Sequence, residues 1–335
     1  MDKPDDLVGD IEALGAVLDR ARRMIARAII GQDEVVELTL SALLAGGHAL
    51  LIGLPGLGKT RLVETLGRVT GLDDGRIQFT PDLMPADILG SEVLEEAADG
   101  SRSFRFLPGP VFCQLLLADE INRASPRTQS ALLQAMQEGE VTVAGAAHRL
   151  DAPFHVLATQ NPLEQEGTYP LPEAQLDRFL LRIDVGYPAR EAERDMLLAT
   201  TGAETATVEP VMSAADLVAA QRLLRRMPVG EAVVEQILDL VRACRPDDPT
   251  APEAVKNAVA WGPGPRAAQA LMLLVRARAL QHGRLAPGPE DIRALARPVL
   301  IHRMALGYAA RARGDDLAEL IGRVTDNLIP PAVAA

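Results

Sequence analysis

The chain has 335 residues, of which 48% are hydrophobic, and a formal net charge of −12. This length exceeds that of most single cores and predicts one large and one smaller domain. The negative charge and an aromatic content of only 3% argue against broad binding to nucleic acid or to an anionic membrane surface.

The cysteines and the N-terminal segment indicate a cytoplasmic protein. Cys113 and Cys244 are far apart and form no C-x-x-C pair, so we expect neither a disulfide framework nor a zinc site. The start of the chain, residues 1–6, is acidic, and the most apolar stretch, residues 42–57, is interrupted by His48, Pro55 and several glycines. We therefore expect no signal peptide and no membrane span.

Two helices are predicted at the beginning of the chain. Apolar residues recur at three-, four- and seven-residue steps between Leu7 and Ile25, which predicts an amphipathic helix over residues 6–27. The segment Ile29 to Gln32 interrupts this pattern, and a second helix is expected over residues 33–44 with Asp33 as its N-cap.

The next part of the chain predicts a parallel sheet covered by helices on both faces. Short apolar runs of strand length alternate with helical patterns, as expected for this arrangement. The strands are predicted at residues 48–52, 76–79, 114–119, 154–159 and 181–185. Two hairpins are inserted: residues 91–105 around a turn at Asp99-Gly100, and residues 141–150 around Gly145.

After Pro188 the composition changes to helix formers punctuated by proline, which predicts a helical second domain. Its helices are expected at residues 191–200, 214–226, 231–244, 265–281 and 289–312. The predicted fold is therefore α/β, with a parallel-sheet core over residues 1–189 and a helical domain over residues 190–335.

A complete phosphate-binding loop follows the first predicted strand. The pattern G-x-x-x-x-G-K-[ST] is formed by Gly53, Leu54, Pro55, Gly56, Leu57, Gly58, Lys59 and Thr60. Its glycines let backbone N–H groups close on a phosphate, the lysine reaches the β- and γ-oxygens, and the Thr60 hydroxyl ligates Mg²⁺. Arg61, the next residue of the following helix, is included in the predicted nucleotide site.

Polar side chains end two further strands of the predicted sheet. Asp119 and Glu120 follow the apolar run at residues 115–118, and Asn161 follows the next strand. Ligands bind at the carboxyl ends of parallel strands. We expect Asp119 to hold Mg²⁺, Glu120 to orient or deprotonate the attacking water, and Asn161 to bind the γ-phosphate or position the water. Asn-Pro also commonly starts a turn, so Asn161 has that alternative.

Two arginines outside the phosphate loop are further candidates. Arg178 is placed at a helix end before the last core strand, and Arg266 lies in the first turn of the helix that begins at Pro265. A guanidinium directed at the γ-phosphate of a neighbouring subunit would stabilise charge in the transition state. A surface ion pair for Arg178 and a solvated helix end for Arg266 are the alternatives.

The ordered set of these motifs resembles the AAA+ ATPases, and more narrowly the MoxR family. Strings close to those of that family are Ile30-Gly31-Gln32, Gln78 to Leu83, Pro108-Gly109-Pro110, Leu117 to Ala124, Ala158 to Pro162 and Pro172 to Phe179. The resemblance implies a P-loop NTPase core with a C-terminal all-helical lid, ATP and Mg²⁺ as cofactors, and contact of the base with the segment containing Ile30 and Gly31. It also implies that Arg178 is the arginine finger and Arg266 the second sensor.

The same resemblance implies a ring, a homo-hexamer, whose ATP sites lie between subunits and whose hairpins face the pore or the partner. Proteins of this family remodel or mature protein complexes, commonly with a partner that has a von Willebrand factor A domain. Two points depart from the simple assignment. The string Gly262-Pro263-Gly264-Pro265 before Arg266 differs from the family's wording, and Arg123, close to Glu120, could share the role of the trans arginine.

Three other functions remain open at the level of the sequence. The chain could be a dedicated activase of the nitric-oxide-reductase or rubisco type, a nucleic-acid motor or loader, or a nucleotide-locked scaffold without turnover. A motor is disfavoured because the first hairpin sets Arg102 and Arg105 against several acidic residues, whereas a hairpin that grips phosphates should be basic. A locked scaffold conflicts with the intact Lys59, Asp119 and Glu120.

Overall fold

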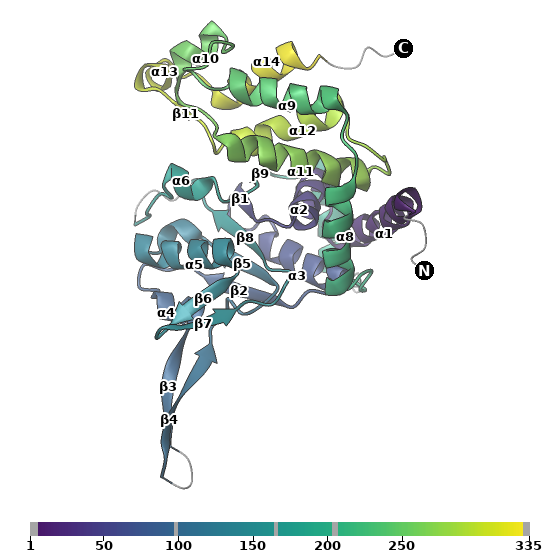
Figure 1. The fold of residues 1–335 in the computed structure, drawn as a ribbon. Helices are drawn as coiled ribbons and strands as arrows, with labels where there is room; N and C mark the ends of the chain where they lie inside the picture. The colour runs from purple at the N-terminus through teal and green to yellow at the C-terminus, as the bar shows by residue number, and fades with distance from the viewer. Residues whose placement is uncertain (1–5, 97–99, 164–166, 203–206, 331–335) are drawn as a thin grey trace.

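A computed structural model of the protein describes residues 6–96, 100–163, 167–202 and 207–330. Its centre is a five-stranded parallel sheet with the strand order β2-β5-β8-β1-β9 (Figure 1). The strands are β1 (Ala49–Gly53), β2 (Asp74–Gln78), β5 (Leu115–Asp119), β8 (His155–Gln160) and β9 (Leu181–Val185). The predicted parallel sheet is confirmed.

Helices lie before and between these strands. They are α1 (Leu7–Ala28), α2 (Asp33–Ala45), α3 (Lys59–Thr70), α4 (Pro85–Leu89), α5 (Pro126–Glu138) and α6 (Glu173–Leu176), with a 3-10 turn η1 (Ile121–Arg123). Both predicted N-terminal helices are present. The predicted cap of the second was wrong, because Asp33 is its first helical residue and Gln32 occupies the cap position without a side-chain hydrogen bond.

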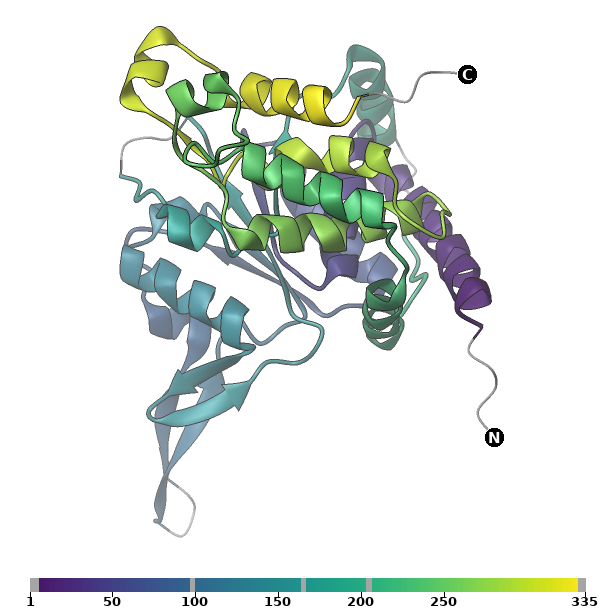
Figure 2. The same ribbon diagram turned by 45° about the horizontal axis from the view of Figure 1, so that its top comes forward.

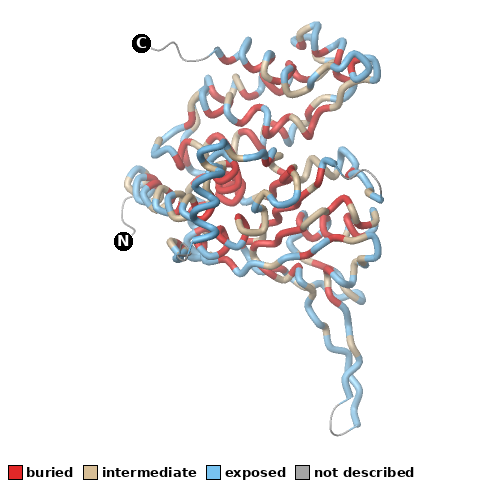
Figure 3. Tube along the Cα trace, turned by 180° about the vertical axis from the view of Figure 1, so that it is seen from behind, coloured by how far each residue is buried: buried red, intermediate tan, exposed pale blue. Residues whose placement is uncertain are grey.

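Two antiparallel hairpins leave the sheet, as predicted. The longer one pairs β3 (Gly90–Glu96) with β4 (Arg102–Pro108), and the shorter one pairs β6 (Glu140–Val143) with β7 (Ala146–Arg149). The β3–β4 hairpin projects far from the body and is exposed along most of its length (Figures 1 and 3). In the predicted turn Asp99-Gly100, Asp99 lies outside the described residues, and Gly100 has a φ of +77°.

The C-terminal part is helical. Its helices are α7 (Arg190–Thr201), α8 (Ala214–Arg226), α9 (Glu231–Ala243), α10 (Glu253–Ala258), α11 (Pro265–Gln281), α12 (Pro289–Leu300), α13 (Tyr308–Arg313) and α14 (Leu317–Leu328). A short ladder joins β10 (Val259–Trp261) to β11 (Ala305–Leu306). The single helix predicted over residues 289–312 was wrong, because α12 ends at Leu300 and the chain turns so that His302 and Arg303 become buried.

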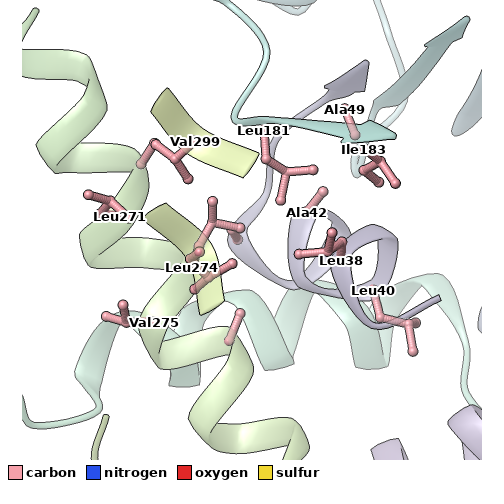
Figure 4. Packing of buried hydrophobic residues seen from close by; sticks show 14 of the residues in the cluster. Leu38, Leu40, Ala42, Ala49, Leu181, Ile183, Leu271, Leu274, Val275 and Val299 are labelled. Carbon is pink, nitrogen blue, oxygen red and sulfur yellow. The ribbon is translucent and has the colours of Figure 1, made fainter. Parts of the chain in front are cut away.

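One continuous hydrophobic cluster joins the sheet to the C-terminal helices. Side chains of α2, β1 and β9 contact those of α11 and α12 in its centre, including Leu38, Leu181, Leu274 and Val299 (Figure 4). The division at residue 190 therefore stays a prediction, since the two parts it separates bury apolar surface against each other. No helix among the described residues is both long and apolar enough to cross a membrane.

Two buried histidines should make the fold sensitive to acid. His48 Nδ1 accepts from the Val156 amide (3.0 Å) and its Nε2 donates to Met136 O (3.1 Å). His155 Nδ1 donates to Gly47 O (2.8 Å). Burial lowers the pKa of each imidazole to about 4, and His155 lowers the pKa of His48 further. Both rings are therefore neutral in the folded protein at pH 5.

We expect the free energy of unfolding to fall as the pH falls from about 6.5 to 4, because in this window the unfolded chain binds protons that the folded protein does not. The loss should be about 2 kcal/mol per histidine at pH 5 relative to neutral pH. Urea denaturation at pH 7 and pH 5 measures it. The variant His155→Asn, which retains a donor for Gly47, should lose about 2 kcal/mol less than the wild type between these pH values, while the buried His302, whose pKa burial also lowers, contributes equally to both proteins. An unchanged loss would contradict this origin.

Candidate nucleotide site

The phosphate loop connects the carboxyl end of β1 to the start of α3. Gly56 and Gly58 have φ values of +83° and +76°, which favour glycine, and no atom lies within 4 Å of a Cβ added to either. Lys59 Nζ donates to Gly53 O (2.7 Å), so the lysine folds back over its own loop. Burial lowers the pKa of Lys59, while Asp119 and Glu120 act in the opposite direction. The loop thus forms an open cradle with a cation beside two carboxylates.

Thr159 fixes the two residues at the end of β5. Its Oγ1 donates to Asp119 Oδ1 (2.6 Å) and accepts from the Glu120 amide (2.8 Å). The second carboxylate oxygen of Asp119 forms an ion pair with Arg76 (2.7 Å). Glu120 has a φ of +56°, an uncommon value for a residue other than glycine. The Thr159 hydroxyl thus fixes the Asp119 carboxylate and the Glu120 backbone at the same point.

The Glu120 carboxylate is held by two donors. Its Oε2 accepts from Gln78 Nε2 (2.8 Å) at the end of β2 and from Arg123 Nη1 (2.9 Å) in η1. Arg123, the alternative trans arginine, therefore binds Glu120 of its own chain.

Asn161 follows β8 and is buried. Its Oδ1 accepts from the Leu163 amide (3.1 Å).

Register brings these residues to one edge of the sheet. β8 pairs with β5 through Ala158 and Ala118, and with β1 through Gln160 and Ile52. The residues that follow these pairs, Asp119, Asn161 and the phosphate loop, therefore leave three adjacent strands at their carboxyl ends.

An apolar cavity of about 150 Å³ lies beside the loop. Gln32 Nε2 closes one side by donating to Leu57 O (3.1 Å). The predicted residue Ile30 lines the cavity, and Arg61 lines both this cavity and a neighbouring one of about 450 Å³ that contains Thr60. The apolar cavity is lined by Ala28, Ile29, Ile30, Gln32, Gly56, Leu57, Gly58, Arg61, Pro188 and Met196. Its size and lining suit the flat, largely apolar face of a nucleobase.

Gly31 should be intolerant of a side chain. Its φ is +74°, and an added Cβ would lie 2.3 Å from Ala192 Cβ on α7. We expect Gly31→Ala to lower the free energy of unfolding by about 2–3 kcal/mol, of which about 1 kcal/mol comes from the backbone and the rest from displacement of α7. Gly283→Ala is the matched control, because its φ is +68° with open space around the Cβ. Chemical denaturation compares the two variants. Equal losses in the free energy of unfolding would mean that the displacement of α7 contributes nothing.

Arg178 and Arg266 lie at the opposite edge of the sheet. Arg178 precedes Leu181, whose partner in the register is Ala49, whereas the phosphate loop follows the pair Gly53 and Val185. Four residues of strand, roughly 13 Å, separate these two edges. Arg178 Nη1 donates to Leu133 O, and Arg266 Nη1 lies 3.8 Å from Asp177 Oδ2. Both arginines line a cavity of about 250 Å³ between the sheet and α11.

Four residues of this arrangement were not predicted from the sequence: Arg76, Gln78, Thr159 and Arg303. Gln78 and Thr159 could have been found, because they occupy the same strand ends as Asp119 and Asn161. Arg303 could not, since its contacts with Asp177 join residues 126 positions apart.

The parallel sheet, the phosphate loop and the acidic strand end, followed by a helical part, define an AAA+ ATPase. The family described as ATPase family associated with various cellular activities (AAA) matches residues 48–181, and the AAA lid domain matches residues 251–322. The confirmed fold is an AAA+ α/β core with a helical lid that contains one short strand pair.

Similar proteins define the family more narrowly. Chaperone MoxR1 of Mycobacterium tuberculosis is 42% identical over 98% of this chain and 86% of its own length. Protein MoxR of Paracoccus denitrificans is 32% identical over 86% and 88% of the two chains. A crystal structure from Cytophaga hutchinsonii, provisionally assigned as an ATPase, superposes with a TM-score of 0.87 at 36% identity over 94% and 96%. The chain belongs to the MoxR family of AAA+ ATPases.

Proposed function

We propose that this protein hydrolyses ATP and uses the reaction to remodel or mature other proteins. The observation that carries this proposal is that Lys59, Asp119 and Glu120 lie together at one edge of the sheet. Burial lowers the pKa of Lys59, and the charges of both carboxylates act against this effect. In this arrangement Lys59 binds the β- and γ-phosphates, Glu120 orients or deprotonates the attacking water, and Asn161 contacts the γ-phosphate side.

The donor set fits ATP and Mg²⁺. The open space at Gly56 and Gly58 lets a phosphate approach the backbone of the loop, and the helix dipole of α3 favours an anion at this point. Thr60 and Asp119 supply the hydroxyl and carboxylate oxygens that Mg²⁺ prefers. When bound, the ion neutralises charge on the phosphates. The segment at Ile30 and Gly31, with Met196, is the proposed base contact.

We further propose that hydrolysis takes place between subunits. Arg178 and Arg266 lie at the edge of the sheet opposite to their own phosphate loop, so they are placed to act on the nucleotide of an adjacent copy. A heterologous contact of this kind forms a ring when the rotation between neighbouring copies closes. Resemblance to the family supports a hexamer in which Arg178 is the finger and Arg266 the second sensor.

The β3–β4 hairpin is the proposed point of contact with protein clients. Leu94 and Phe104 are opposite each other in its register and are 55% and 71% exposed. Its charges are paired internally, Glu95 with Arg105 and Glu96 with Arg102, each at 3.1 Å. An exposed apolar pair between neutralised charges suits a protein surface better than a phosphate backbone. The names of the relatives support chaperone action, and the family supports a von Willebrand factor A domain partner; a dedicated activase is the alternative.

The decisive experiment is Mg²⁺-dependent ATP hydrolysis as a function of protein concentration, with Lys59→Ala, Arg178→Ala and their mixture. Each variant alone should be inactive, and specific activity of the wild type should rise with concentration. In an equal mixture, about a quarter of the interfaces join the intact phosphate loop of an Arg178→Ala subunit to the intact Arg178 of a Lys59→Ala subunit. About a quarter of the wild-type activity should therefore return. Absence of recovery, with activity independent of concentration, would refute shared sites.

A further inference from the structure

Helix α7 presents apolar side chains to the outside of the molecule. None of its residues is buried, and Leu197 and Leu198 are 57% and 62% exposed. Its inner side contacts the nucleotide site, because Ala192 lies against Gly31 and Met196 lines the apolar cavity. Since helical residues repeat every 3.6 positions, Leu197 and Leu198 flank the side opposite to Ala192. Two adjacent exposed leucines beside a functional site indicate an interaction surface.

The lid carries a groove of matching character. It has a volume of about 480 Å³ and lies between α9 and α11. Its lining is mainly apolar: Val234, Ile237, Leu238, Ala268, Met272 and Leu273, with Arg225 and Gln269. Gln269 and Leu273 also line the cavity that contains Arg178 and Arg266. The groove therefore adjoins the two arginines proposed to act across the subunit boundary.

The helix and the groove lie on opposite faces of the molecule. In Figure 1, α9 and α11 are at the front, whereas Figure 2 shows α7, the teal helix, behind α14. The proposed shared sites require the arginine face of one copy to meet the phosphate-loop face of the next. This same approach brings α7 of one copy towards the groove of its neighbour.

We propose that α7 of one subunit packs into the α9–α11 groove of an adjacent copy of this chain, with Leu197 and Leu198 as its anchors. This inference rests on the proposed shared sites and adds the surface that aligns them. It links the base pocket of one subunit, through Met196 on α7, to the lid of the next. The contact would thereby couple nucleotide occupancy to the position of the neighbouring lid.

Charged residues of both signs border the two surfaces, with Arg194 and Glu191 beside the leucines on α7 and Arg225 in the lining of the groove. Arg194 precedes Leu197 and Leu198 by three and four positions, so its side chain emerges between theirs. On α9, the exposed Glu231 and Glu235 precede Val234 and Leu238 by three positions each and border the lining of the groove. Seating the leucines would place Arg194 near these carboxylates. An amphipathic helix in an apolar groove is a common mode of recognition.

Site-directed cross-linking tests the contact in the full chain. Leu198→Cys and Leu238→Cys, mixed in the presence of Mg²⁺ and ATP, should give a covalent dimer with a short bis-maleimide, and the double variant should give a ladder of higher multimers. Cys113 and Cys244 are buried, and burial raises the pKa of each thiol to about 12, so the wild type should remain monomeric on a denaturing gel. Leu328→Cys, at an exposed leucine of α14, replaces Leu238→Cys as the matched control.

A functional readout accompanies the cross-link. Leu197→Ser with Leu198→Ser should lower specific ATPase activity at least tenfold at low protein concentration, and raising the concentration should restore it. Recovery of activity in the mixture of Lys59→Ala and Arg178→Ala without the Leu198–Leu238 cross-link would overturn this docking while leaving shared sites intact. The cross-link without that recovery would support the docking and refute the shared catalytic site. Equal cross-linking to Leu328→Cys would also overturn the docking.

Discussion

Glu120→Gln is expected to lower the ATP turnover rate by about 10²–10⁴-fold, the usual contribution of a general base. The amide retains an oxygen that accepts from Gln78 and Arg123, so the local structure should persist while the proton acceptor is lost. Nucleotide affinity should change less than about threefold, because Lys59, Thr60 and the loop remain intact. Steady-state phosphate release gives the rate, and titration with a fluorescent ATP analogue gives the affinity.

Glu138→Gln is the control for this change. Glu138 is an exposed carboxylate of α5 whose contacts with Gln134 an amide can largely replace. Its activity should equal that of the wild type. A turnover rate of Glu120→Gln within about threefold of the control would remove Glu120 from the reaction and would assign the activation of the attacking water to another group.

The site was predictable to the extent that its signals are local. A phosphate loop is a contiguous string whose glycines set its backbone, and the carboxyl ends of parallel strands must share one edge of a sheet. These two facts place Gly53 to Thr60, Asp119, Glu120 and Asn161 together, as the structure does. Roles within this group, and the intersubunit roles of Arg178 and Arg266, stay predictions until they are tested by mutation.

The predictions failed where a distant contact overrides a local pattern. The apolar periodicity of residues 289–312 favours one helix, yet α12 ends at Leu300 and the following residues bind the turn that precedes β9. Arg303 and His302 both donate to Phe179 O, which lies more than 120 positions earlier.

Arg303 is the centre of a buried hydrogen-bond network between the lid and the core. It is 1% exposed, and its five N–H groups donate to Asp177 Oδ1 (2.7 Å) and to backbone carbonyls. The carbonyls belong to Val299 (2.7 Å), Phe179 (2.6 Å), Leu180 (3.0 Å) and Asp177 (3.3 Å). Burial lowers the pKa of the guanidinium, and Asp177 opposes this change. Arg303 therefore binds the lid to the turn from Asp177 to Leu180, which contains Arg178.

Arg303→Met is expected to lower the free energy of unfolding by about 3–5 kcal/mol, because it removes the donors to Asp177 Oδ1 and to the carbonyls of Val299 and Leu180. Arg297→Met, on α12 just before the turn that contains Arg303, is the control. Its ion pair with Asp184 is exposed, so its loss should cost no more than about 1 kcal/mol. Chemical denaturation compares the two variants, and equal losses would mean that the network around Arg303 contributes little.

Substitution of Arg303 should also lower the ATP turnover rate if the turn from Asp177 to Leu180 sets the position of Arg178. Arg303→Lys keeps the charge but offers at most three donors in a different geometry, so it should fold at low temperature with the turn imperfectly held. Under these conditions we expect a lower turnover rate with unchanged nucleotide affinity, because the affected subunit has an intact phosphate loop and supplies a misplaced finger. Mixing with Arg178→Ala should then give no recovery, since neither partner contributes a correctly placed arginine, whereas mixing with Lys59→Ala should restore activity. Recovery with Arg178→Ala would instead place the defect outside the finger.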